Sequence, residues 1–148
     1  MRRPVKSLPD TNILIRYLTR DDEPLYVRAK EFFDKVKEGS TKAIILESVI
    51  AECLYVLTKI YKVPKNKAAE SLIDILHYKG IANQDQQELI RALTLFSERN
   101  LDIVDCILCV KAASSNTSLF SFDGELNKMS DSLRYSSSDE METAPLPA

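Results

Sequence analysis

Residues 7–18 have the sequence SLPDTNILIRYL, which marks a change from extended chain to helix. The segment from Val5 to Pro9 is predicted to form a short strand, and apolar residues then recur at helical spacing from Asn12 to Arg20. Asp10 lies between the two elements. Aspartate is a favoured helix N-cap, but the carboxyl end of a strand is also where parallel sheets bind ligands. The stretch therefore predicts a strand-to-helix junction whose carboxylate is a cap, part of a site, or both.

Short apolar segments alternate with longer helical patterns along the rest of the chain. Strands are predicted at 42–46 (KAIIL) and 118–122 (SLFSF), and helices at 24–38, 48–61, 63–80, 83–98 and 102–115. Ser48 and Asn83 are the predicted N-caps of two of these helices. Because helices separate the strands, as parallel crossovers require, the pattern predicts an α/β fold with a mainly parallel central sheet.

Length and composition are those of a globular protein with one domain. The chain has 148 residues, of which 45% are hydrophobic and 28% charged. We expect a domain over residues 1–135 and an acidic, disordered tail over 136–148, where the apolar pattern stops. No apolar run is long enough to span a bilayer, and no signal-peptide core follows the N-terminus, so we expect a cytoplasmic protein without a membrane partner. The three cysteines lie in apolar helical stretches, which predicts buried free thiols.

Charge is distributed unevenly along the chain. Residues 1–67 contain 14 Lys and Arg against 9 Asp and Glu, whereas residues 68–148 contain 6 against 13. A basic half beside an acid-rich half suits a phosphate-bearing partner that approaches an acidic site. Ordinary variation of surface charge explains the same numbers equally well.

Four acidic residues fall just after a predicted strand or in the first turns of a helix: Asp10, Glu52, Asp105 and Asp123. Each has a structural explanation, since acids cap helices, reach out to water and form Asp-Gly turns. Together they are predicted at one edge of the sheet, where unpaired carboxylates would repel one another. A divalent cation would relieve that repulsion, and ligands that are all oxygen suit Mg²⁺ or Mn²⁺. The pattern favours metal-assisted phosphodiester chemistry.

Four sequence blocks, PDTNILIRYL, ESVIAECLYVLTKIY, LDIVDCILCVKA and FSFDGELNK, resemble those of the PIN domain in order and spacing. The likeness extends over about residues 5–130 and is greatest to the VapC-type toxins of toxin–antitoxin pairs. It implies a three-layer α/β/α fold and an endoribonuclease that depends on Mg²⁺ or Mn²⁺. It also implies a homodimer, and a small DNA-binding antitoxin that inhibits it.

The resemblance assigns metal binding to Asp10, Glu52, Asp105 and Asp123, and polar support of the site to Thr11, Asn12 and Ser121. Pro9 departs from the family pattern, because the family has an apolar strand residue there. The basic segment KIYKVPKNK could bind RNA through Lys59, Lys62, Lys65 and Lys67, or be an ordinary solvated helix end.

Other functions remain to be weighed against this one. A catalytically silent domain of the same fold, acting in dimerisation or RNA binding, is the main alternative. A haloacid-dehalogenase-like phosphatase needs D-x-D after its first strand, and Asn12 occupies the second of those positions. A response-regulator receiver needs a lysine after a late strand, and none follows Phe122 there. The C-x-x-C of Cys106 and Cys109 has no second pair, so a zinc site is not expected.

Overall fold

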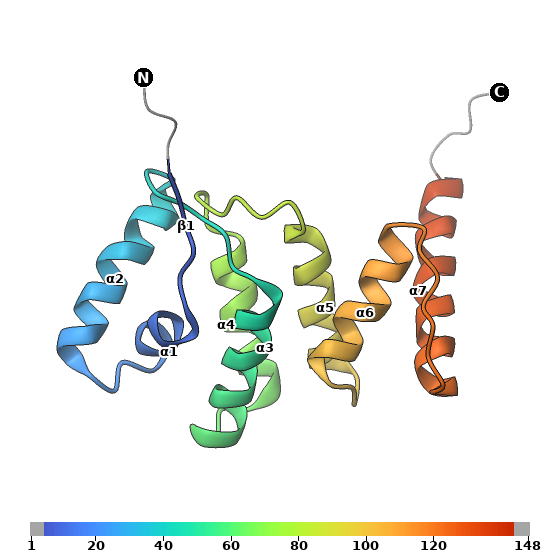
Figure 1. The fold of residues 1–148 in the computed structure, drawn as a ribbon, viewed down its shortest axis with the longest axis horizontal. Helices are drawn as coiled ribbons and strands as arrows, with labels where there is room; N and C mark the ends of the chain where they lie inside the picture. Colours follow the sequence, from blue (N-terminus) through green and yellow to red (C-terminus); the bar gives the residue numbers. More distant parts are fainter. Residues whose placement is uncertain (1–4, 144–148) are drawn as a thin grey trace.

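The structure is a computed structural model that describes residues 5–143, with side chains up to residue 134. Figure 1 shows a succession of helices beside two short strands near the N-terminus. The strands are β1 (Lys6–Ser7) and β2 (Lys42–Ala43). The helices are α1 (Thr11–Thr19), α2 (Glu23–Glu38), α3 (Glu47–Tyr55) with its π-helical continuation η1 (Val56–Ile60), α4 (Lys65–Leu76), α5 (Gln86–Glu98), α6 (Ile103–Ser114) and α7 (Gly124–Thr143).

The sheet is parallel, as predicted, but shorter than the apolar segments led us to expect. β1 and β2 pair with Lys6 opposite Lys42 and Ser7 opposite Ala43, and Ala43 forms a further parallel bridge to Ile81. Beyond β2, the next backbone hydrogen bonds at the sheet edge are made by the side chain of Asn83. The Asn83 amide accepts from the Ile45 N–H at 2.9 Å and donates to the Ile45 carbonyl at 2.8 Å. Asn83 therefore extends the sheet edge instead of capping α5, which begins after Asp85.

Residues 118–122 are a correction to the sequence prediction, because they form no strand in the described structure. They lie in extended chain that runs beside α7 (Figure 1), where Asn127 donates to the Ser121 carbonyl at 2.9 Å. Phe120 and Phe122 are 87% and 98% exposed. The apolar pattern of SLFSF predicted a buried strand, but a strand needs a neighbouring edge, and this segment lies against the last helix instead.

The last helix also affects the predicted domain boundary. The backbone of α7 continues to Thr143, past residue 136 where the tail was predicted to begin. Residues 144–148 lie outside the described part of the chain. The division into a domain at 1–135 and a tail at 136–148 therefore stays a prediction.

The core lies between the sheet and the helices that follow it. Fully buried side chains come from nearly every element, among them Leu14, Phe33, Ile45, Ile50, Leu72 and Leu93. Local signals set α2 at both ends: Asp22 caps its first turn, Pro24 lies in that turn, and Gly39 ends it with φ of 92°. Tyr17 stacks on Phe33 with ring centroids 4.6 Å apart. This packing holds α1, which Asp10 caps, against α2.

Candidate active site

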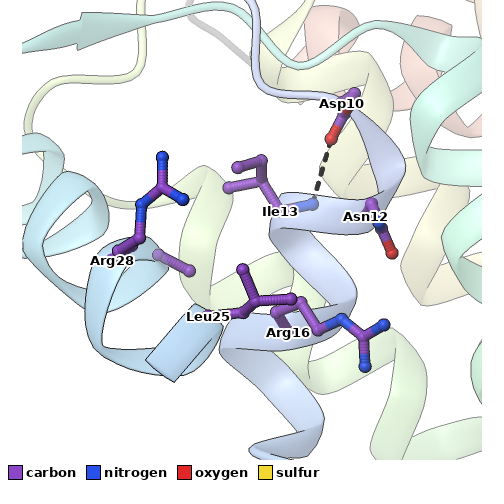
Figure 2. A pocket seen from close by; sticks show the side chains of 7 residues that line it. Asp10, Asn12, Ile13, Arg16, Leu25 and Arg28 are labelled. Carbon is purple, nitrogen blue, oxygen red and sulfur yellow. Dashed lines mark hydrogen bonds between the residues drawn. The ribbon is translucent and has the colours of Figure 1, made fainter. Parts of the chain in front are cut away.

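Asp10 is the N-cap of α1, immediately after the chain leaves β1. Its backbone is extended, with φ of −85° and ψ of 173°, and its carboxylate accepts a hydrogen bond from the Ile13 N–H at 3.0 Å (Figure 2). The side chain is exposed. The capping role is thus confirmed. It uses one carboxylate oxygen in this bond, so it does not by itself prevent the group from binding a ligand.

Glu52 approaches the same region from α3. Burial, and then the negative charges of Glu52 and Asp10, raise the pKa of the Cys53 thiol to about 12. The Cys53 Sγ lies 3.9 Å from the Thr11 carbonyl oxygen, which joins the start of α1 to the middle of α3. The contact joins the two elements that carry Asp10 and Glu52. That the two carboxylates form one site stays a prediction.

Asp105, in the first turn of α6, lines a separate hollow of about 460 Å³ together with Glu47, Lys111 and Ser121. Lys111 Nζ forms ion pairs with Glu47 Oε2 at 2.5 Å and with Asp85 Oδ2 at 2.8 Å. Burial raises the pKa of Asp85, but hydrogen bonds from Lys111 and Asn83 outweigh it, so that pKa is lowered. Lys111 thus neutralises two acids, Glu47 at the start of α3 and Asp85 directly before α5.

Asp123 lies directly before α7 and caps the first turn of that helix. Its carboxylate accepts from the Glu125 N–H at 3.0 Å and from the Leu126 N–H at 3.3 Å, which is the Asp-Gly turn that the sequence also allowed. Ser121 Oγ accepts from the Asp123 N–H at 3.0 Å. Among the residues with described side chains, no three His, Cys, Asp or Glu converge as a metal-ligand set.

The remaining predicted residues have mixed surroundings. Asn12 lines a second hollow of about 250 Å³ between α1 and α2, next to Asp10. Of the four lysines proposed for RNA, Lys65 donates to the Arg99 carbonyl at 2.6 Å and lies over the Phe96 ring, 4.5 Å from its centroid. It therefore ties α4 to the end of α5. The other three, Lys59, Lys62 and Lys67, are exposed to solvent.

Sequence reasoning missed Glu47 and Lys111, which line the hollow of Asp105. It also missed Arg28, which lines the hollow between α1 and α2. A signal for Lys111 was available, because a cation within the apolar run CILCVKAA needs a partner. No comparable signal marked Glu47 or Arg28, whose neighbours come from other helices.

A family model for the PIN domain matches residues 7–131, which is most of the chain. The chain belongs to the PIN domain family. The match confirms the resemblance drawn from the four sequence blocks, and with it the α/β/α class, which this PIN domain realises with a short sheet. The chain is also 30% identical over 107 residues to a protein named VapC ribonuclease from Aquifex aeolicus (strain VF5). That alignment covers 72% of this chain and 78% of the relative. No solved structure matches it.

Proposed function

We propose that this PIN domain is a VapC-type endoribonuclease, the toxin of a type II toxin–antitoxin pair, which hydrolyses phosphodiester bonds in RNA. The observation that carries the proposal is the alignment with the relative named VapC ribonuclease, over 72% of the chain. The carboxylates of Asp10 and Glu52, on elements joined by the contact of Cys53 with Thr11, support it, since such groups can orient a water molecule toward phosphorus and accept its proton. A small DNA-binding antitoxin, a homodimer and a cytoplasmic location are parts of the same proposal. In residues 5–143, no helix has the length and hydropathy that crossing a bilayer requires.

Dependence on Mg²⁺ or Mn²⁺ is also proposed. The donors fit in type, because carboxylate oxygens are the ligands that these hard cations prefer. Asp10 and Glu52 would hold the cation, with Asp105 and Asp123 assigned by resemblance alone. A bound cation would stabilise the negative charge on the phosphate oxygens. Thr11, Asn12 and Ser121 remain the proposed polar support.

The test is cleavage of total cellular RNA by the purified protein, with Mn²⁺ or with a chelator. Asp10→Asn is a clean variant because asparagine caps helices as well as aspartate does, so α1 should remain intact. Asp131→Asn, on the exposed surface of α7, is the matched control. We expect discrete fragments that need the cation, that Asp10→Asn lowers by orders of magnitude and that Asp131→Asn leaves unchanged. Full activity of Asp10→Asn would refute the assignment of this residue.

A catalytically silent domain of the same fold is the second candidate. It is favoured by one observation: the described side chains do not gather three acids at one point. If folded wild-type protein bound RNA but cleaved no RNA class with either cation, that reading would replace the nuclease. Asp123→Asn is informative here, because loss of cleavage in this variant would mean that Asp123 reaches the site during the reaction.

A further inference from the structure

The hollow between α1 and α2 opens directly beside Asp10. Its lining comes from the two helices: Asp10, Asn12, Ile13, Arg16, Leu25, Arg28 and Ala29. Two of the apolar residues are partly open to solvent, with Ile13 39% and Leu25 36% exposed. In Figure 2 Ile13 lies between Asp10 and Arg28, and Leu25 lies below Ile13. The hollow thus has an apolar middle, an acid at one end and a base at the other.

The two arginines of this hollow differ in their partners. Arg16 is held by Asp21, with Nη1 and Oδ1 2.9 Å apart, and Figure 2 shows its side chain directed away from Arg28. Arg28 is exposed, and no described residue pairs with its guanidinium through a hydrogen bond or a salt bridge. Arg28 is therefore available to an anion from outside, whereas Arg16 is already neutralised.

We propose that this hollow binds one nucleotide of single-stranded RNA next to the bond to be cleaved, with Arg28 on a backbone phosphate and Ile13 and Leu25 against the base or ribose. The inference rests on the proposed function and adds a substrate-positioning residue to it. Asp10 repels a phosphate that approaches alone, and a guanidinium across the hollow offsets that repulsion. The planar guanidinium also pairs with two phosphate oxygens at once.

The size of the hollow limits what it can hold. Its volume of about 250 Å³ is below the range of about 300–1,000 Å³ typical of sites for whole small-molecule ligands. It therefore suits one unit of a longer chain that continues over the surface on both sides. An acidic peptide could also reach Arg28, but it would gain nothing from proximity to Asp10, whereas a nuclease substrate must lie there.

The test compares Arg28→Gln with Lys30→Gln, a neutralised cation on the same helix that does not line the hollow. Lys30 already pairs with Asp34 at 2.6 Å, which makes it a matched control. Binding of a fluorescent single-stranded RNA oligonucleotide is measured by anisotropy over a range of NaCl concentrations, with chelator present to keep the probe intact. We expect Arg28→Gln to weaken binding about tenfold. The slope of log K against log[NaCl] should become shallower by the ~0.7 expected for one phosphate contact with a single strand. Lys30→Gln should bind like wild type.

A third variant separates charge from geometry. Arg28→Lys keeps the positive charge but loses the planar pair of donors, so it should keep the wild-type salt dependence with only part of the affinity. In cleavage assays we expect Arg28→Gln to raise KM with little change in kcat, because Arg28 positions the substrate and does not touch the reacting atoms.

The outcomes distinguish this inference from the proposed function. Wild-type binding and salt dependence in Arg28→Gln, with active wild-type protein, would overturn the inference and leave the nuclease intact. An inactive wild-type protein whose RNA binding still depends on Arg28 would refute the nuclease and leave the role of Arg28 in RNA binding intact. Equal losses in Arg28→Gln and Lys30→Gln would mean general charge attraction and would refute a specific contact. If Arg28→Gln bound RNA normally but lost binding of a poly-glutamate peptide, the hollow would be a protein-docking site, and the inference would be wrong.

Discussion

Replacing Asn83 with alanine is expected to destabilise the protein through the edge of the sheet. The Asn83 side chain makes both hydrogen bonds to the Ile45 backbone and a third, at 3.0 Å, to Asp85 Oδ1. Ile45 is fully buried, and α3, which carries Glu52, begins two residues later. Alanine removes all three bonds and leaves the Ile45 N–H and carbonyl without these partners.

The magnitude follows from those bonds. Each hydrogen bond contributes about 1 kcal/mol net, and a buried polar group left unpaired costs about 1–3 kcal/mol. Asn83 is only half-buried, so water can reach part of the gap. We therefore expect a loss of about 3 kcal/mol in the free energy of unfolding, which lowers Tm by roughly 6–12 °C for a chain of this size.

The assay is urea unfolding followed by circular dichroism, with Asn66→Ala as control because Asn66 is exposed on α4. The midpoint should fall for Asn83→Ala at an unchanged slope, and Asn66→Ala should stay within about 0.5 kcal/mol of wild type. A loss below about 1 kcal/mol for Asn83→Ala would mean that the side-chain ladder does not support the sheet.

Three further predictions concern single sites. Gly80→Ala should lower the free energy of unfolding by about 3 kcal/mol or more, because a Cβ there would lie 2.1 Å from the Thr41 carbonyl oxygen. Gly124→Ala is the control in the same thermal melts and should be nearly neutral, because no atom lies within 4 Å of its Cβ position. Asp21→Asn should lower Tm at neutral pH but not at pH 2. The Tyr61 hydroxyl and then Arg16 depress the pKa of Asp21 from 3.8 to about 2, so its stabilisation is present above about pH 4 and is lost as pH falls toward 2; a Tm difference that persisted at pH 2 would contradict this. Lys111→Met should destabilise the protein less at pH 3 than at pH 7, since it leaves Asp85 and Glu47 charged at neutral pH; equal losses at both pH values would refute the ion-pair account.

The helices were largely predictable because their ends depend on neighbouring residues. Asp10 caps α1 and Asp22 caps α2 through side-chain bonds to N–H groups three residues ahead, and Gly39 ends α2 in a conformation that glycine adopts freely. The strand at 118–122 was wrong because pairing depends on a distant edge, which no local pattern encodes. Asn83 was misassigned for the same reason: its partner, Ile45, is 38 residues away.

For the candidate site, the elements that carry the acids were predictable from the sequence, and the neighbours of the acids were less so. Asp10 follows β1 and Glu52 lies on the helix after β2, and these two strands pair, so the topology predicts that both acids lie at one edge of the sheet. Glu47 was not among the predicted site residues, yet it lines the same hollow as Asp105. Its partner Lys111 comes from a helix far along the chain, and only the packing of α3 against α6 reveals the pair.

The three buried cysteines can report local opening of the core, because a thiol reacts only when it becomes accessible. Burial is the main cause that raises the pKa of each thiol, to about 12 for Cys53 and Cys106, so alkylating reagents should react only when the surrounding core parts. Cys53 lies on α3 next to Glu52 and 3.9 Å from the Thr11 carbonyl oxygen, whereas Cys106 and Cys109 lie on the buried side of α6. The order in which the thiols are labelled under native conditions would therefore show whether the region around Asp10 and Glu52 opens before the rest of the domain.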